Sequence, residues 1–385
     1  MANQAPGGSG GGRSRVLAAA EKRDWLRLIR SERIGPVTFF RLLERFGSAA
    51  RALERLPDLA KRGGGSAPAL YPEAEAEGEL ETLAKLGGST VAVGEPDYPP
   101  LLAHVEDAPP LLAVLGHRAL LRRKAVAVVG ARNATLGGRR FARALASDLG
   151  RAAYVVVSGL ARGIDAAAHE GALQTGTVAV QGGGVDVVYP PENAALHDKI
   201  RAHGAIVSEM ACGTQPLARH FPRRNRIISG IARGVVVVEA SPQSGSLITA
   251  RFALDQGREV FAVPGAPGDP RAQGTNGLIR QGAVLTESAA DVIQHLAHFA
   301  DRQIDEPAQP FAARDMVNVD HGEAELAAAQ KIIVENLGFT PLPVDEIIRS
   351  CQFSPAVVLT VLLELELAGR LERHPGNQVS RLRGA

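Results

Sequence analysis

The sequence is poor in cysteine, in aromatic residues and in long apolar stretches, and each shortage excludes a class of protein. Its two cysteines, Cys212 and Cys351, supply neither a disulfide framework nor a four-ligand zinc site. No apolar run approaches about 18 residues, so no transmembrane helix is expected. Residues 1–14 form a Gly/Ser-rich tail, expected to be disordered, without the apolar centre of a signal peptide. We therefore expect a reduced, cytoplasmic protein.

Acidic residues are absent from two segments that are rich in arginine. The net charge is only +2, from 43 basic and 41 acidic residues, so composition alone indicates no partner. Yet no Asp or Glu occurs in residues 108–147 or in residues 211–238, and both segments carry several arginines. Two interpretations stay open at this point. The arginines bind a polyanion, or they are balanced by acidic residues from elsewhere in the fold.

The spacing of apolar residues divides the chain into domains. Residues 15–95 are predicted to form a helical domain of the SAM or helix-hairpin-helix type, in which Phe39, Leu42, Leu43 and Phe46 share one helical face. Such hairpins can hold nucleic-acid backbones through amides at a helix start, although short helical modules more often only pack against a neighbour. Residues 96–300 form the main domain, residues 301–320 a linker and residues 321–385 a further small domain.

The main domain alternates short apolar runs with helical patterns. Runs of this length are typical of strands buried on both faces of a parallel sheet. The predicted strands are Ala125–Val129, Tyr154–Val157, Thr177–Val180, Ala205–Val207, Val235–Val238 and Glu259–Val263. The predicted fold class is α/β, a doubly wound Rossmann-like sheet whose ligands bind beyond the carboxyl ends of the strands.

The last domain reads as three helices followed by a β-hairpin, which is the pattern of a winged helix. Ser354 and Pro355 are a good start for its third helix, residues 355–368. This helix would enter a DNA groove, yet it carries Glu364 and Glu366 and no Lys or Arg, while the basic residues cluster on the wing. We therefore expect it to dock a protein, or to touch DNA through the wing, rather than to read duplex DNA.

The turns that follow the predicted strands hold the candidate binding site. Glycines let backbone amides approach an anion, small hydroxyl residues add donors, and arginines offer planar forks to phosphate oxygens. The candidate residues are Gly130, Arg132, Thr135, Ser158, Gly159, Arg162, Gly163, Phe221, Arg223, Arg224, Asn225, Arg226, Ser244, Gly245 and Ser246. Because Arg132 and Arg224 are expected in loops, replacing either by Glu should weaken binding and leave the fold intact.

Several catalytic and cofactor-binding classes lack their motifs. There is no GxxxxGK[ST], and the first turn is not GxGxxG with a following ribose-binding acid, so neither a P-loop nucleotidase nor a dinucleotide enzyme is expected. Asp165 and His169 share a helical face, but bracing of that helix is favoured over acid–base catalysis. No cofactor, metal or catalytic residue is predicted. Since aromatics make up only 4%, and only Phe221 lies in an arginine cluster, binding should depend on phosphates more than on base stacking.

The order of these turns resembles that of the DNA-processing protein A family (DprA, also called Smf). The matching stretches are Gly130-Ala131-Arg132, Ser158 to Asp165 with His169, Tyr189-Pro190, Ser208-Glu209, Phe221-Pro222-x-Arg224-Asn225-Arg226, Ser244 to Ala250 and Val263-Pro264-Gly265. The resemblance implies a homodimer, formed through the Rossmann-like domain, that binds single-stranded DNA, shields incoming transforming DNA and loads RecA recombinase onto it. It also implies that Arg132, Ser158–Arg162 and Phe221–Arg226 line the DNA pocket, and that no catalysis takes place.

The alternative from another class is a nucleotide-binding enzyme. Phosphoribohydrolases of the lysine-decarboxylase-like family have a related sheet, but their P-G-G-x-G-T-x-x-E motif is absent, since Gly182-Gly183-Gly184 continues into Val185-Asp186. A third hypothesis is a transcriptional regulator that acts through the winged helix, and the acidic residues of its third helix argue against it. The proline-containing linker further predicts that a fragment ending near Ala300 folds and binds single-stranded DNA.

Overall fold

The structure is a computed structural model that describes residues 15–302, 322–374 and 376–382. These residues form two compact units. The sheet unit contains residues 15–17 and 78–302, and the helical unit contains residues 18–77 and the described residues from 322 onward. The expected tail and the expected linker from residue 303 lie outside the described residues. Among the described residues, no helix is both long and apolar enough to cross a membrane.

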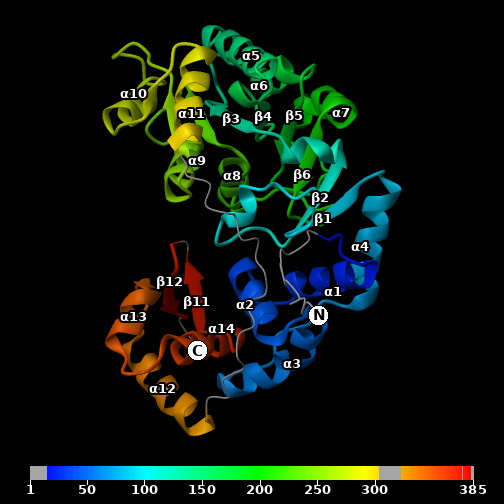
Figure 1. Cartoon of the computed structure of the whole chain (residues 1–385), viewed down its shortest axis with the longest axis vertical. Helices are drawn as coiled ribbons and strands as arrows, with labels where there is room; N and C mark the ends of the chain where they lie inside the picture. The colour runs from blue at the N-terminus through cyan, green and yellow to red at the C-terminus, as the bar shows by residue number, and fades with distance from the viewer. Residues whose placement is uncertain (1–14, 303–321, 375, 383–385) are drawn as a thin grey trace, which may run out of the picture. The chain divides into compact units, whose positions relative to one another are not determined.

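A mostly parallel sheet forms the centre of the sheet unit (Figure 1). Within the described residues it has nine strands in the order β1-β2-β6-β5-β4-β3-β7-β8-β9, and the antiparallel pairings are those of β2 with β1 and with β6. The bounds are β1 Ser89–Ala92, β2 Leu111–Gly116, β3 Ala125–Gly130, β4 Val155–Ser158, β5 Thr177–Val180, β6 Ala205–Ser208, β7 Gly234–Val238, β8 Glu259–Ala262 and β9 Val284–Leu285. The six predicted strands are confirmed, whereas β1, which precedes residue 96, and β2 and β9 were not predicted.

The direction of winding changes between β3 and β7. The chain runs outward from β3 through β4 and β5 to β6, and then returns to place β7 and β8 on the other side of β3. This is the predicted doubly wound arrangement. Its crevice lies at the carboxyl ends of β3 and β7, where the two halves of the sheet diverge.

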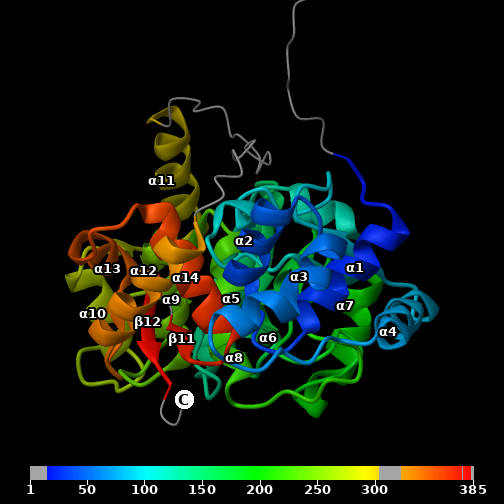
Figure 2. The same cartoon turned by 90° about the horizontal axis from the view of Figure 1, so that it is seen from below.

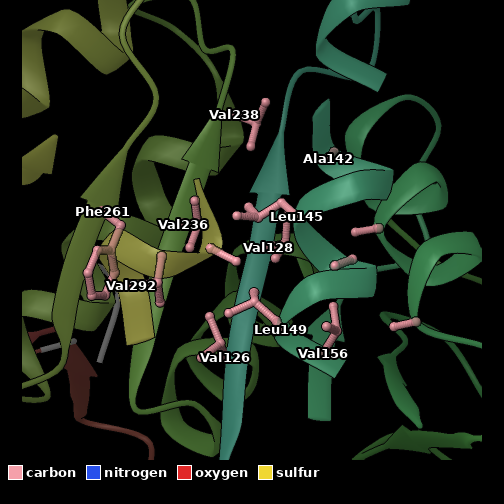
Figure 3. Close-up of a cluster of buried hydrophobic side chains, with 14 of the residues drawn as sticks. Val126, Val128, Ala142, Leu145, Leu149, Val156, Val236, Val238, Phe261 and Val292 are labelled. Carbon is pink, nitrogen blue, oxygen red and sulfur yellow. The ribbon is translucent and has the colours of Figure 1, made fainter. Parts of the chain in front are cut away.

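Apolar side chains hold helices against both faces of this sheet, and Figure 3 shows the cluster on one of them. On one face, Val126 and Val128 of β3 and Val236 of β7 meet Leu145 and Leu149 of α5. Helices α5, α6, α7 and α11 cover this face, and α8 and α9 cover the other. Their bounds, with that of α10, are α5 Leu136–Arg151, α6 Ile164–Ala172, α7 Ala194–His203, α8 His220–Ile231, α9 Gly245–Asp255, α10 Gln273–Arg280 and α11 Ala289–Arg302.

The helical unit combines an N-terminal and a C-terminal part. The first part contains α1 Ala19–Arg30, α2 Pro36–Phe46, α3 Ala49–Arg62 and the start of α4 Glu73–Lys85. The second contains α12 Glu323–Asn336, β10 Leu342–Pro343, α13 Val344–Ser350, α14 Pro355–Leu367, β11 Leu371–His374 and β12 Gln378–Arg381. This is the predicted winged helix, and the Ser354 hydroxyl caps α14 with Pro355 at its first position. Phe39 and Leu42 of α2 are fully buried, as their spacing predicted.

Helix α14 of the winged helix packs against the N-terminal helices (Figure 2). Leu363 and Leu367 are buried in the same cluster as Phe39, Leu42 and Leu56. The helix that would enter a DNA groove is therefore covered by α2 and α3. The winged helix keeps a core of its own around Ile333, Val358 and Leu362, and α14 also contributes Leu363 and Leu367 to the core of the N-terminal helices.

Polar contacts explain the unusual charges of the winged helix. The Thr38 hydroxyl donates to Glu366 over 2.7 Å, and Arg62 lies 3.1 Å from the Glu364 carboxylate. Arg370 donates to the Gly63 carbonyl oxygen over 3.2 Å, and Arg373 donates to Glu366 over 3.4 Å. The acidic residues of α14 and two arginines at the wing thus stabilise the contact within the unit. Arg373 lies on the wing strand β11, as predicted, and both arginines are half-buried in these contacts.

Candidate functional site

Two adjoining cavities lie at the crevice of the sheet unit. The aromatic cavity is bounded by Tyr189 and Phe221, with Gly182 and Gly183 after β5 in its wall. The serine-lined cavity continues toward the start of α9, where Ser244 and its neighbours form the wall. Arg132, Ala161, Phe221 and Arg224 line both cavities. The position agrees with the rule that ligands bind at the carboxyl ends of strands near the reversal of strand order.

An aromatic pair and an arginine form the exposed part of the aromatic cavity. The Tyr189 and Phe221 ring centroids are 5.6 Å apart, and the rings are inclined by 40°. The Arg132 guanidinium carbon lies 5.3 Å from the Phe221 ring centroid, within the range of a cation–π contact. Among the described residues, no carboxylate lies within ion-pair distance of Arg132. The site therefore offers a planar apolar surface beside a free positive charge.

Tyr189 lines the aromatic cavity, although it was not among the candidate residues predicted from the sequence. The residue is 44% exposed, and it reaches the site from the segment that follows β5. The only signal in the sequence was the Tyr189-Pro190 pair that the family resemblance includes. With Tyr189 beside Phe221, stacking on one base becomes available, although the overall aromatic content is low.

Arg224 lies beneath the cavities and not in a loop. It belongs to α8, is only 5% exposed, and donates to the Val180 carbonyl oxygen over 3.0 Å. A Cβ added at Gly159 would lie 1.5 Å from a terminal nitrogen of Arg224, so only glycine leaves room for this side chain. Burial lowers the pKa of Arg224 to about 10, and the charge of Asp165 opposes that shift. Arg224 is thus a fixed cation under the floor of the site, and the expectation of an exposed loop arginine is wrong.

Asp165 links the floor of the site to the turn after β4. Its carboxylate accepts the amides of Gly159 over 3.1 Å and Ala161 over 3.4 Å. Burial raises the pKa of Asp165, while the charge of Arg224 and these two amide bonds oppose the shift. The amide of Gly159 therefore donates to Asp165 within this turn and not to a ligand. The role that remains for Gly159 is to leave space for Arg224.

His169 is unsuited to acid–base catalysis. It is fully buried, and its Nδ1 atom lies 2.7 Å from the Thr177 hydroxyl. Burial, reinforced by the charge of Arg224, lowers the pKa of His169 to about 3, so the ring is neutral at physiological pH. This supports the interpretation of Asp165 and His169 as bracing residues. In the described part of the chain, no three His, Cys, Asp or Glu residues gather in a way that would hold a metal ion.

Three further candidates support the framework of the site. The Ser158 hydroxyl donates to the Val128 carbonyl oxygen over 2.7 Å and is fully buried. A Cβ at Gly130 would lie 1.8 Å from the Val238 carbonyl oxygen, so glycine is needed there for strand packing. Arg226 is 4% exposed and forms an ion pair with Glu209. The assignment is corrected for Ser158 and Arg226, whose side chains are engaged within the protein, whereas Gly130 lines the serine-lined cavity and stays a candidate.

The start of α5 is occupied by the carboxylate of Glu239, the residue that follows β7. Glu239 accepts the Thr135 amide over 2.8 Å and also the Thr135 hydroxyl, which in turn caps the Gly138 amide over 2.9 Å. In dinucleotide-binding sheets this helix start holds the pyrophosphate. Here the negative charge of Glu239 lies where the pyrophosphate would bind, so a phosphate at this turn is disfavoured. Thr135 is a structural cap of α5.

The remaining candidates are distributed around the rim. Ser244 caps α9 at the Ser246 amide, and both belong with Gly245 to the serine-lined cavity. Asn225 donates to the Gly245 carbonyl oxygen over 3.3 Å and thereby ties α8 to α9. Arg162 is exposed at the aromatic cavity and pairs with Glu192, whereas the exposed Arg223 lines neither cavity. Gly163 begins α6 with a φ of +78°, a conformation that favours glycine.

The chain matches known proteins along its length. A family model described as DNA recombination-mediator protein A matches residues 89–297. A DprA-like N-terminal HHH domain matches residues 19–82, and a DprA winged helix domain matches residues 320–377. Protein Smf of Escherichia coli strain K12 is 39% identical over 318 residues, which cover 82% of this chain and 83% of that protein.

Two solved structures resemble the chain. DNA processing protein A from Streptococcus pneumoniae superposes with a TM-score of 0.55 and 39% identity, over 64% of this chain and 82% of that one. DNA processing protein A from Helicobacter pylori, whose structure describes a single-stranded DNA binding mode, gives a TM-score of 0.50 and 28% identity. That match covers 55% of this chain and 96% of the Helicobacter chain.

Proposed function

The chain belongs to the DNA-processing protein A (DprA/Smf) family, and from this premise we propose that its sheet unit binds single-stranded DNA during DNA processing for transformation. Arg132 and the Tyr189–Phe221 pair are the groups that meet the strand. A base stacks on the rings, and the adjoining phosphate pairs with Arg132. Duplex DNA keeps its bases inside the helix, so this site selects the single strand.

One observation carries this proposal. The guanidinium of Arg132 lies 5.3 Å from the centre of the Phe221 ring, beside Tyr189 and above the buried charge of Arg224. A nucleotide has one flat apolar face and one anionic group a short distance away. The site presents the matching pair of surfaces side by side.

We propose that the protein acts without catalytic turnover. Asp165 and the Nδ1 atom of His169 form internal hydrogen bonds, and His169 stays neutral at physiological pH. In the phosphoribohydrolase alternative, a nucleotide phosphate would have to bind at a helix start other than that of α5, because Glu239 occupies this one. Release of free base from a nucleoside monophosphate is the assay for that alternative, and no release is expected.

The wider role follows from the family. We propose that the protein works in the cytoplasm as a homodimer joined through the sheet unit, protects incoming single-stranded DNA and loads RecA recombinase onto it. Because α14 is covered by α2 and α3, duplex reading through this helix is not part of the proposal. The winged helix has an internal protein partner in the N-terminal helices, and a further protein partner would use its other surfaces.

Replacing Arg132 by Glu is expected to weaken binding of oligo-dT strongly without lowering the melting temperature. Arg132 is exposed, so the fold does not depend on it, while each lost charge-assisted contact is worth about 1.5–3 kcal/mol, roughly ten- to hundredfold in affinity. Fluorescence anisotropy with single-stranded and duplex oligonucleotides measures the effect. Arg280→Glu on α10 is the matched control, because Arg280 is exposed and lies outside both cavities. Unchanged affinity of the Arg132 variant would refute the site.

Replacing Phe221 by Leu separates stacking from charge. The leucine keeps an apolar side chain but removes the aromatic face, so the affinity should fall by about 1–3 kcal/mol. The slope of log K against log salt should stay the same, whereas Arg132→Gln should make it about 0.7 less steep. A salt series on the two variants distinguishes these effects. If Phe221→Leu binds like the wild type at all salt concentrations, bases do not stack at this site.

A further inference from the structure

A third cavity leads away from Arg132 on the side of α5 and α6. It has a volume of about 340 Å³, and its charged and polar lining consists of Arg132, Arg139, Arg143, Arg162, Glu170 and Asn193. The rest of the lining is glycine and alanine. It shares Arg132 and Arg162 with the aromatic cavity, so the two depressions meet at these residues. We call it the arginine groove.

The chemistry of the arginine groove differs from that of the aromatic cavity. Its lining holds four arginines and one carboxylate, Glu170, which is paired with Arg143, while Arg162 pairs with Glu192 outside the lining. Arg139 has no carboxylate within ion-pair distance among the described residues. The lining contains no aromatic side chain and no large apolar one. Such a surface has nothing on which a base could stack, but it suits a chain of phosphates.

The local structure explains why these arginines share one surface. Arg139 and Arg143 are four residues apart on α5, so both project from the same face of the helix. Helices α5 and α6 lie side by side (Figure 1), and the small residues Gly163, Ala166 and Ala167 at the start of α6 keep the floor of the groove low. A polynucleotide backbone can therefore approach without meeting bulky side chains.

We propose that the arginine groove holds the phosphodiester backbone of the strand whose base occupies the aromatic cavity. The inference rests on the proposed function and extends it. One nucleotide is fixed at Tyr189 and Phe221, Arg132 holds the phosphate at the junction, and Arg139 and Arg143 pair with phosphates farther along the strand. The binding surface thus has two parts, the aromatic cavity, which stacks a base, and the arginine groove, which binds phosphates by charge alone.

The double variant Arg139→Ala/Arg143→Ala tests the groove. Oligo-dT of about 4 nucleotides and of about 16 nucleotides, the limits of common site sizes, are compared in full-length protein by anisotropy. The long strand is expected to bind roughly tenfold or more weakly, because two charge-assisted contacts are lost. Its salt slope should also be less steep by about 1.4, from two phosphate contacts. The short strand, held at the aromatic cavity, is expected to bind as it does to the wild type.

The matched control is Arg140→Ala/Arg151→Ala. These arginines are also exposed on α5 and do not line the groove, so the control removes the same charge from the same helix. Equal losses in both double variants would overturn the proposal, since only general charge would matter. Wild-type binding of the long strand by Arg139→Ala/Arg143→Ala, with binding still lost in Arg132→Glu, would overturn the groove alone. Wild-type binding in both would overturn the groove and the proposed function together.

Discussion

Replacing Arg224 by Met is expected to lower the melting temperature of the sheet unit by about 10 °C. Removing one member of a buried charge pair costs about 3–5 kcal/mol, and each kcal/mol corresponds to about 2–4 °C in a domain of this size. Arg224 is 5% exposed and offsets the charge of Asp165, which keeps its amide bonds to the turn after β4. Without the guanidinium, Asp165 is left buried beside a cavity.

Differential scanning calorimetry of three variants tests this prediction. Arg223→Met is the matched control, because Arg223 is the neighbouring residue on α8 and is exposed, and it should melt like the wild type. Arg224→Lys keeps the charge but not the planar fork that donates to Val180, so part of the stability should return. A wild-type melting temperature for Arg224→Met would show that this charge is not needed to hold the floor of the site.

Cutting the chain after residue 302 is expected to unfold its N-terminal helices while the sheet unit still binds single-stranded DNA. The cut removes Leu363 and Leu367 from the core that they share with α2 and α3, and each buried leucine contributes about 1.5–3 kcal/mol. A module of about 60 residues has only a few kcal/mol of stability in total. The sheet unit, with its own core, keeps its site.

Limited proteolysis measures the effect directly. In the shortened protein, residues 18–77 should be cut much faster than in the full chain, while residues 78–302 remain protected. In the full chain, Leu367→Ala should sensitise the same segment, whereas Ile332→Ala should not, because Ile332 is 39% exposed. Equal protection of residues 18–77 in both proteins would mean that the N-terminal helices fold without α14. The simpler expectation from the linear sequence, that the shortened fragment folds throughout, would then hold.

Local patterns in the sequence determined the elements and their order. The valine-rich runs predicted the strands β3 to β8, because strands buried on both faces tolerate only apolar residues at every position. Ser354 and Pro355 marked the start of α14, and Phe39 and Leu42 marked the buried face of α2, since capping and helical periodicity act over a few residues. The order of these elements led to the doubly wound sheet and to the position of its crevice.

Only the tertiary structure decided what each candidate side chain does. Arg132 and Arg224 follow similar turns in the sequence, yet one is exposed beside Phe221 and the other is buried over Asp165. Thr135 is hydrogen-bonded to the Glu239 carboxylate. The acidic face of α14 likewise meets helices from the opposite end of the chain. Burial and charge pairing join residues far apart in sequence, and no local pattern encodes which distant partner will fill a given space.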